Sequence, residues 1–139
     1  MYKNLKTPFL KQTAFGLLIL GSLTLTLAHG EQAKLVRVPL QTHDLSTPEK
    51  VVVQVRAEFP ESAAAGRHTH PGEEIGYILE GQLELRVDGQ PTRILKAGDV
   101  FFIPPGVIHD GINTGSGMTK VLATYVVEKG KPVATLIPN

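Results

Sequence analysis

Short β-rich segments separated by turns run through most of this sequence, from Val51 to Glu128. β-Branched and aromatic residues are concentrated in these segments, and Gly or Pro residues interrupt the chain between them, as expected of strands bounded by turns. In Gln82–Val87 apolar and polar residues alternate strictly, which indicates a strand with one buried face. After Gly30 no helical apolar period continues without a Gly or Pro interruption. The pattern therefore predicts an all-β sandwich or barrel.

The boundaries of the elements follow from the same pattern. We expect residues 31–50 to form an irregular lead-in with one edge strand over Lys34–Val38, residues 51–128 to form the β-barrel, and residues 129–139 to form a tail. Within the barrel, strands are predicted over Val51–Phe59, Glu74–Gly81, Gln82–Val87, Thr92–Lys96, Val100–Pro104 and Lys120–Glu128.

The first thirty residues differ from the rest in composition. A start with three lysines and no acid is followed by the uncharged, mostly apolar run Ala14–Ala28 and by the small-x-small exit Ala28–Gly30. This order is typical of a secretory signal peptide, so we predict cleavage after Gly30, with Ala28 as the alternative. An uncleaved membrane anchor is the competing interpretation, but the apolar run is shorter than the roughly 20 residues that span a bilayer.

Charge and cysteine content restrict the partners of the chain. Of its 14 Lys and Arg, three lie in residues 1–30, which hold none of the 13 acids, so the mature chain has two more acids than bases. A slightly acidic domain without a basic patch is not expected to bind nucleic acid. The chain has no Cys, which excludes Cys-ligated zinc and Cys nucleophiles. We predict a bacterial exported protein of the periplasm, with no stable membrane insertion after cleavage of the signal peptide.

The segment HTHPGEE, residues 68–74, brings two histidines and two glutamates close together. On a strand, His68 and His70 point to the same face, because successive side chains alternate. Pro71-Gly72 bends the chain, so that one glutamate can turn back toward the histidines. If Glu74 begins the next strand, it shares a face with Gly76 and Ile78, and Glu73 falls on the other. Such a segment also occurs in solvated loops, so alone it leaves a metal site and a surface loop both open.

A second segment, GDVFFIPPGVIHDGIN over residues 98–113, adds a third histidine, His109, after a strand and a Pro-Pro-Gly turn. Together the two segments resemble the two signature motifs of the cupin superfamily. The first motif reads H-T-H-PGE-E-IGYILE-G from His68 to Gly81, and the second reads G-DVFFI-P-P-G-VI-H-DGI-N from Gly98 to Asn113. Sixteen residues separate the motifs, a compact spacing typical of small bacterial members. One departure is Ser62, where the family pattern often has Gly six residues before the first His.

The resemblance implies a jelly-roll (double-stranded β-helix) barrel that binds one divalent transition metal. It implies the metal ligands His68, His70, Glu74 and His109, and it assigns Glu73 to the rim. Three imidazoles and one carboxylate accept Fe, Mn, Ni, Cu or Zn, and the sequence does not choose among them. Four protein ligands leave about two of six octahedral positions open, which favours a small-molecule substrate or ligand over a closed structural site. The resemblance also implies pairing of two copies into a homodimer.

Strand parity alone predicts which apolar and polar residues surround such an ion. The candidates for an apolar lining are Val53, Val55, Ile78, Leu85 and Phe102, most of which also suit ordinary barrel core. Tyr125, Thr124 and Arg56 are candidate polar contacts, with a surface position the better expectation for Arg56. Turn roles are expected for Asp99, Asn113 and glycines 81, 98 and 106, because glycine adopts positive φ without strain.

Three functions are consistent with these features. The open site and its glutamate ligand resemble those of dioxygenase-like cupins, so the first expectation is a small metal-dependent oxygenase, an oxidoreductase, acting on a small organic molecule. The alternatives are a non-catalytic exported metal or small-ligand binding module and a metal-dependent isomerase or lyase. No P-loop, no G-x-G-x-x-G and no Ser-His-Asp constellation is evident, so no nucleotide cofactor is expected.

Overall fold

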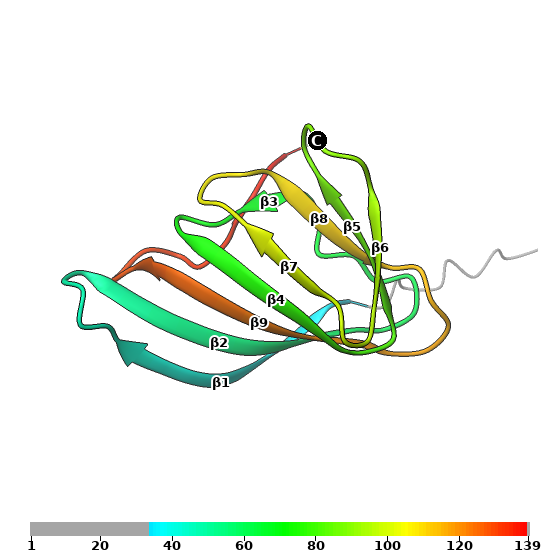
Figure 1. Cartoon of the computed structure of the whole chain (residues 1–139), viewed down its shortest axis with the longest axis horizontal. Helices are drawn as coiled ribbons and strands as arrows, with labels where there is room; N and C mark the ends of the chain where they lie inside the picture. The colour runs from blue at the N-terminus through cyan, green and yellow to red at the C-terminus, as the bar shows by residue number, and fades with distance from the viewer. Residues whose placement is uncertain (1–33, 139) are drawn as a thin grey trace, which may run out of the picture. The chain divides into compact units, whose positions relative to one another are not determined.

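The computed structural model describes residues 34–138, which form ten strands, β1 to β10 (Figure 1). The predicted signal peptide, residues 1–30, lies outside the described residues. Within residues 34–138 no helix has the length and hydropathy needed to cross a bilayer.

The strands form two five-stranded antiparallel sheets, as in a jelly roll, so the predicted all-β class is confirmed. The first sheet has the order β1-β2-β9-β4-β7 and consists of β1 (Val36–Asp44), β2 (Lys50–Phe59), β9 (Thr119–Glu128), β4 (Glu73–Glu80) and β7 (Val100–Ile103). The second has the order β10-β3-β8-β5-β6 and consists of β10 (Thr135–Leu136), β3 (His68–Thr69), β8 (His109–Asn113), β5 (Gln82–Val87) and β6 (Arg93–Lys96).

The core lies between the two sheets, because each sheet turns its apolar face toward the other. Along β9, buried and half-buried residues alternate over the whole strand, so every second side chain points inward. The main core cluster combines Ile78 and Val121 of the first sheet with Leu83 and Leu85 of the second. Any polar side chain on these inner faces is therefore removed from solvent and needs a partner.

Six of the ten strands match the predicted segments to within about two residues at each end. The lead-in differs from the prediction, because β1 is a nine-residue strand that pairs with β2 from Val36↔Glu58 to Asp44↔Val51. Its side chains are mostly exposed, and its pairing with β2 is irregular between Pro39 and Gln41. In an edge strand of this kind the side chains do not alternate between buried and exposed, and Pro39 interrupts the apolar pattern of the sequence.

The tail also contains a strand that the sequence did not indicate. Thr135 and Leu136 of β10 pair with Thr69 and His68 of β3, and the Ile137 amide donates to the Arg67 carbonyl at 2.9 Å. The C-terminal segment thus holds the strand that carries the first histidine of the HTH segment.

Turn residues behave largely as expected. Glycines 81, 98 and 106 all have positive φ. Ser62, at the position where cupin motifs often have Gly, also has a positive φ of 64°. Only glycine adopts this backbone region without strain, so Ser62 holds a backbone conformation that a glycine would favour.

Candidate metal centre

Three buried histidines of the second sheet converge in the interior of the molecule. His68 on β3 and His109 on β8 are directly paired across the two strands, and His70 follows β3. The ring centroids lie 4.2 Å apart for His68–His109, 4.8 Å for His68–His70 and 5.0 Å for His70–His109. One nitrogen from each ring lies within 4.8 Å of the others, so the three could hold a metal ion together.

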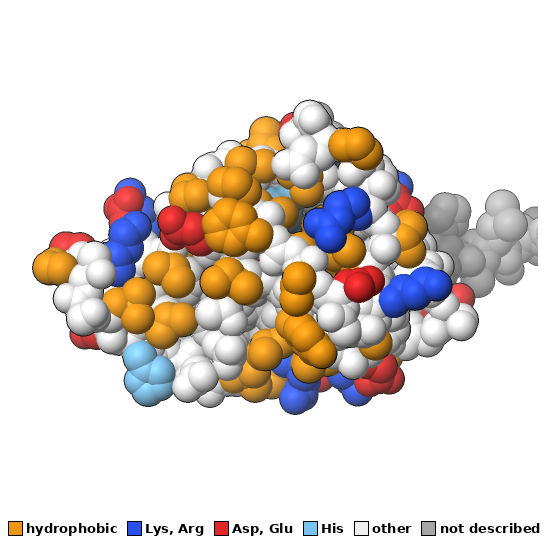
Figure 2. All heavy atoms as spheres, viewed as in Figure 1, with side chains coloured by type: hydrophobic (Ala, Val, Ile, Leu, Met, Phe, Trp, Pro, Cys, Tyr) orange, Lys and Arg blue, Asp and Glu red, His pale blue; other side chains and the backbone are white. Residues whose placement is uncertain are grey.

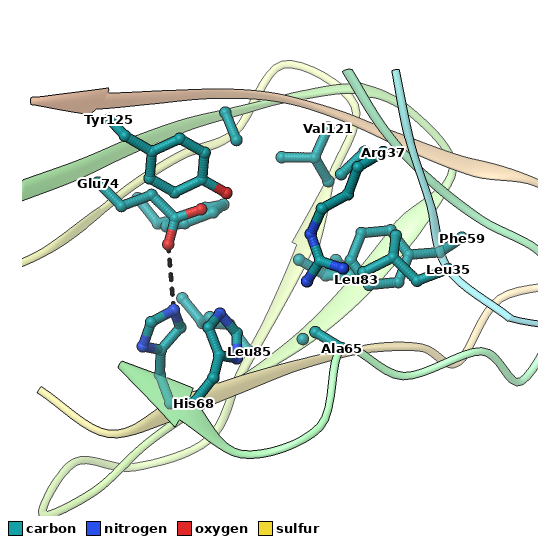
Figure 3. A pocket seen from close by; sticks show the side chains of 15 residues that line it. Leu35, Arg37, Phe59, Ala65, His68, Glu74, Leu83, Leu85, Val121 and Tyr125 are labelled. Atoms are coloured by element: carbon teal, nitrogen blue, oxygen red, sulfur yellow. Dashed lines mark hydrogen bonds and ion pairs between the residues drawn. The ribbon is translucent and has the colours of Figure 1, made fainter. Parts of the chain in front are cut away.

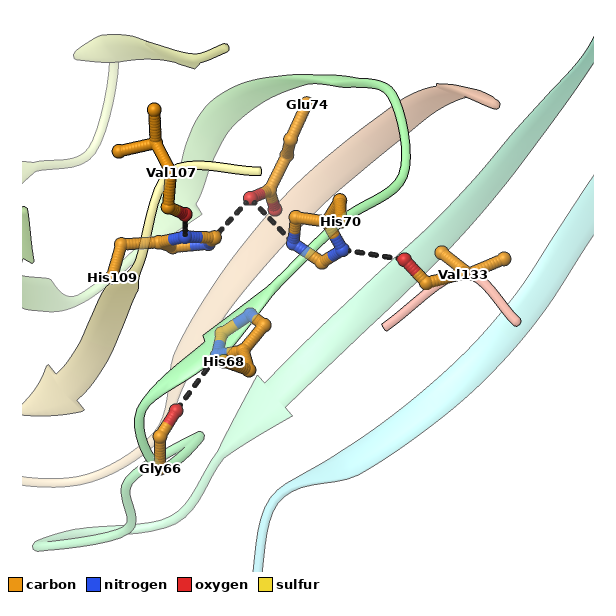
Figure 4. Close-up of polar contacts among 7 residues, drawn as sticks. All are labelled: Gly66, His68, His70, Glu74, Val107, His109 and Val133. Carbon is orange, nitrogen blue, oxygen red and sulfur yellow. Dashed lines mark hydrogen bonds and ion pairs between the residues drawn. The ribbon is translucent and has the colours of Figure 1, made fainter. Parts of the chain in front are cut away.

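Each histidine is oriented by a backbone carbonyl at its Nδ1 atom (Figure 4). The distances are 2.7 Å from His68 to Gly66 O, 2.6 Å from His70 to Val133 O and 3.0 Å from His109 to Val107 O. A carbonyl only accepts, so each Nδ1 carries the proton and donates it. The Nε2 lone pairs of the neutral rings then face the centre of the cluster, which is the arrangement that metal-binding histidines require.

Glu74, on β4 of the opposite sheet, closes the cluster. Its Oε2 lies 3.0 Å from His109 Nε2 and 3.1 Å from His70 Nε2, although the His70 contact lacks the angles of a hydrogen bond. His109 thus has an acceptor at both nitrogens, whereas a neutral imidazole donates only one proton. A metal ion or a second proton between His109 and Glu74 would satisfy both atoms.

The pKa values reflect this pairing. Burial alone would raise the pKa of Glu74, but the contacts of His109 and His70 outweigh it and lower the pKa to about 2. Burial alone would lower the pKa of His109, but Glu74 and the Val107 carbonyl raise it above its usual value. For His68 burial prevails and lowers the pKa to about 4. A neutral His68 and an ionised Glu74 are both in the state that binds a metal ion.

Strand parity explains why Glu74 rather than Glu73 faces the cluster. Glu74, Gly76 and Ile78 are buried on the inner face of β4, as the sequence predicted, while Glu73 is half-buried on the other face. The preceding bend packs closely on β9, since a Cβ on Gly72 would lie 1.9 Å from the Val126 carbonyl oxygen. Only glycine fits there, so the turn that brings Glu74 to the histidines depends on this residue.

A cavity of about 410 Å³, open solvent at its mouth included, begins at the cluster and continues between the sheets (Figure 3). Its walls are mostly apolar and include His68, His109 and Glu74. The other lining residues are Leu35, Arg37, Ala57, Phe59, Ala65, Leu83, Leu85, Phe101, Gly111, Val121, Ala123 and Tyr125. A mostly apolar lining with a few converging polar groups is the composition of a site for a small organic molecule.

Some of the predicted lining residues are in place and others are not. Leu85 lines the cavity, Val53 and Val55 line a neighbouring cavity that shares Arg37 and Tyr125, and Ile78 belongs to the core. The prediction for Phe102 is wrong, because 57% of its surface is exposed. Its neighbour Phe101 points inward, since the register of β7 against β4 places Phe101 beside Gly76, where the ring occupies the space of a Cβ.

Of the three candidate polar contacts, Tyr125 lies at the cavity, and Thr124 and Arg56 do not. Tyr125 is buried, lines the cavity and lies with its ring 4.7 Å from that of His70. Burial, and then the adjacent Glu74 carboxylate, raises the pKa of its phenol, so the hydroxyl stays protonated and can donate. Thr124 accepts a hydrogen bond from Gln54 and Arg56 pairs with Glu58 at 2.7 Å, both away from the cavity. As expected, Asn113 and Asp99 make turn contacts, to the Gly115 amide and to the Lys96 amide.

Arg37, Phe59 and Leu35 are cavity residues that the sequence pattern did not indicate. Phe59 ends a predicted strand and could have been found by extending its parity. Leu35 and Arg37 lie in the segment predicted to be an irregular lead-in, where the alternation of Val36, Val38 and Leu40 would assign the opposite face to the interior.

Comparisons with known proteins agree with this geometry. A family model described as "Cupin domain" matches residues 55–125, half of the chain. The HTH-type transcriptional regulator PuuR of Escherichia coli K12 is 33% identical over 79 residues, covering 56% of this chain and 42% of PuuR. A 3-hydroxyanthranilate 3,4-dioxygenase of Burkholderia cenocepacia is 40% identical over 72 residues, covering 50% of this chain and 38% of the enzyme.

Among solved structures, the DMSP lyase DddQ from Ruegeria pomeroyi superimposes with a TM-score of 0.55 at 28% identity, covering 61% of this chain and 42% of DddQ. The chain thus spans about two fifths of the length of each of these three proteins. By their names they are a transcriptional regulator, a dioxygenase and a lyase.

Proposed function

The chain belongs to the cupin family, and from this premise we propose that it is a metal-dependent oxygenase of small organic molecules whose metal ligands are His68, His70, Glu74 and His109. The observation that carries the proposal is the convergence of three buried imidazole Nε2 atoms and one buried carboxylate at the end of a mostly apolar cavity. This donor set accepts Fe, Mn, Ni, Cu or Zn.

The protein's own residues prepare the site in three ways. The carbonyls of Gly66, Val107 and Val133 hold the imidazoles in the tautomer that leaves Nε2 free. Glu74 adds one negative charge, so that a divalent ion in the site keeps a net positive charge that attracts an anionic oxygen. When bound, the metal supplies Lewis acidity and, if redox-active, electron transfer with dioxygen.

The cavity walls contribute orientation and exclusion of water. Phe59, Phe101 and the leucines of β5 surround a ligand with apolar surface. Tyr125 presents a protonated hydroxyl beside Glu74, where it can donate a hydrogen bond to a ligand oxygen. Substituting Tyr125→Phe should lower turnover while leaving metal content unchanged, which separates a role toward the ligand from one toward the ion.

The test begins with elemental analysis of natively expressed protein. Oxygen uptake is then followed with the iron, manganese and nickel forms against 1,3-diketones, catechols and flavonoids, with anaerobic reactions as controls. We expect oxygen-dependent turnover for at least one metal and substrate class. His109→Ala should abolish it, while His43→Ala, an exposed histidine on β1, should not. Product formation without oxygen uptake would contradict an oxygenase.

Two other functions are each supported by one relative. Likeness to DddQ favours a lyase or isomerase, in which the product forms equally well under anaerobic conditions. Likeness to PuuR favours a non-catalytic binding module, for which the metal-loaded protein would bind ligands from the same panel without turnover. The anaerobic arm and a binding measurement therefore separate all three functions.

Export belongs to the same proposal. We propose that residues 1–30 direct the chain to the periplasm and are removed there, as their composition predicts. Fractionation of a bacterial host that expresses the full chain, followed by N-terminal sequencing of the periplasmic form, tests it. A mature N-terminus at Glu31, or at His29 for the alternative site, is expected, and retention of the full-length chain in the membrane fraction would contradict it.

We also propose a homodimer. Exposed apolar side chains gather on the outer face of β4 and on the edge strand β7 (Figure 2), among them Ile75, Tyr77 and Phe102. Burying such a patch against its copy would remove apolar surface from water. Sedimentation equilibrium of wild type and Phe102→Ser tests this, with a dimer expected for wild type and a weakened dimer for the variant. A monomeric wild type would contradict the proposal.

A further inference from the structure

Arg37 lies on the inner face of the first sheet although its segment looks like an exposed edge. In the β1–β2 register Arg37 is paired with Ala57, which is buried, and paired residues of antiparallel strands share a face. Its side chain lines both the cavity at the metal centre and the neighbouring one (Figure 3). Arg37 therefore presents a permanent positive charge to the space that reaches the histidines.

The guanidinium of Arg37 has no hydrogen-bond or ion-pair partner within residues 34–138. Arg56, Arg67 and Arg86 form ion pairs of 2.6 to 2.7 Å with neighbouring acids. Arg93 donates to the Val100 carbonyl at 3.2 Å. Arg37 alone among the described arginines makes neither a hydrogen bond nor an ion pair. Its five donors are free to bind a ligand.

The surroundings of Arg37 determine what that ligand would be. Among residues 34–138, Arg37 is the only Lys or Arg that lines either of the two cavities, and Glu74, within the histidine cluster, is the only carboxylate. The same cavity is lined by apolar side chains, among them Leu83 and Val121 near Arg37 (Figure 3). A ligand that spans this space has an oxygen donor at one end, an apolar body, and an anionic group at the other end.

We propose that Arg37 is a specificity-determining residue that binds the carboxylate of the substrate, and that the substrates are small organic acids carrying a second oxygen donor for the metal centre. A planar guanidinium matches a carboxylate with two parallel, charge-assisted hydrogen bonds, and Arg37 is exposed and therefore accessible to such a ligand. The substrate class rests on the proposed function, whereas recognition of the carboxylate can be measured without turnover.

The test uses pairs of probes that differ only in charge. Each carboxylic acid is compared with its uncharged amide: salicylate with salicylamide, 3,4-dihydroxybenzoate with its amide, and acetoacetate with acetoacetamide. Binding to the metal-loaded protein is measured by calorimetry. Wild type should bind at least one acid about tenfold or more tighter than its amide, because a hydrogen-bonded charge pair contributes that much.

The variants separate recognition from stability and from metal binding. Arg37→Gln should remove the preference for the acid and leave affinity for the amide, metal content and melting temperature unchanged. Arg37→Lys should keep part of the preference. Arg56→Gln, a matched arginine paired with Glu58 away from the cavity, should behave as wild type.

Equal or absent binding of acid and amide by wild type in all three pairs, or an undiminished preference in Arg37→Gln, would overturn the assignment. Because the experiment measures binding, the role of Arg37 can be confirmed even if the protein has no oxygenase activity. Conversely, oxygen-dependent turnover of neutral substrates alone would leave the proposed oxygenase function intact and refute the role of Arg37.

Discussion

The two sheets of this protein differ in how firmly they are built and in what they contribute to the site. In the first sheet β2 and β9 are paired over ten residues, from Lys50↔Glu128 to Phe59↔Thr119. In the second sheet the histidine-bearing β3 has a single pair with β8, His68↔His109, and two pairs with β10. Yet the first sheet supplies only Glu74 to the cluster, whereas the second sheet, with His70 just after β3, supplies the three histidines.

This difference indicates that the two sheets have different roles: the first stabilises the fold, and the second supplies most of the candidate metal ligands. The long sheet is stabilised by its own hydrogen bonds and by packing. The short strand β3 has few backbone bonds and is held by its neighbours, including the carbonyl of Val133 and the pairing with β10. A metal ion bound to residues of both sheets would connect them, so stability at the centre should depend on the ion more than stability elsewhere.

The largest effect should come from the packing of the long sheet. Phe101→Ala removes a buried ring that fills the space beside Gly76, and should reduce the free energy of unfolding by about 3 to 5 kcal/mol. Phe102→Ala, one residue along the same strand, removes an exposed ring and should change it by less than about 0.5 kcal/mol. Urea unfolding of both metal-free variants measures the contrast. Equal losses would show that the two faces of β7 are not distinguished by burial.

The next effect concerns the ion itself. Metal at 100 times its dissociation constant should stabilise the native protein by about 2.7 kcal/mol, or about 10 to 20 °C in melting temperature for a domain of this size. His109→Ala should abolish most of this gain, because it removes one ligand and leaves Glu74 with one contact fewer. His43→Ala on β1 provides the control in differential scanning calorimetry. A metal-dependent shift that persists in His109→Ala would exclude His109 as a ligand.

The C-terminal segment offers a way to test the weak sheet without touching a ligand. Truncation after Lys131 removes the Val133 carbonyl that orients His70 and the strand β10. Losing such a partner should weaken metal binding about 10- to 100-fold. Hydrogen exchange should show faster exchange in β3 while β2 and β9 stay protected. Truncation after Ile137, which keeps both features, is the matched control, and equal affinities in the two truncations would contradict the role of the tail.

The smallest effect is the pH dependence of metal affinity. In the metal-free protein Glu74 stays ionised down to a pKa of about 2 and His68 stays neutral down to about 4, so neither binds a competing proton above pH 4. His109, whose pKa is raised, is protonated first as the pH falls, and metal must displace that proton.

Below the pKa of His109 the logarithm of the affinity should therefore fall by at least about one unit per pH unit, because each proton on a ligand must be displaced by the metal. Competition titrations against a metal chelator, carried out from pH 8 to 5, measure this slope of metal affinity against pH. A constant affinity over the whole range would show that no proton is displaced and that His109 does not bind the ion.

Much of this site could be predicted from the sequence because its determinants are local. The spacing of His68 and His70, the bend at Pro71-Gly72 and the parity of β4 place two imidazoles and one carboxylate on inner faces before any long-range contact is known. The long alternating strands were equally accessible, since burial on one face imposes a period of two on the sequence.

The features of the site that the sequence did not predict depended on pairing between distant segments. Phe102 was assigned to the cavity by parity, but the register of β7 against β4 turned Phe101 inward instead. β10 and the contact of Val133 with His70 join residues more than sixty positions apart, and a two-residue strand carries no pattern of its own.

Arg37 shows most clearly which features follow from the sequence and which are decided only by tertiary structure. By itself the sequence determined the strand-rich fold, because burial on one face imposes a period of two on a strand, and its resemblance to the cupin motifs indicated the three histidines and Glu74 as ligands. The sequence Leu35–Leu40 places Val36, Val38 and Leu40 on one face, so parity alone would direct Arg37 away from an apolar interior. Only tertiary structure decided otherwise: the outer face of an edge strand stays exposed, and pairing with Ala57 turns Arg37 toward the cavity.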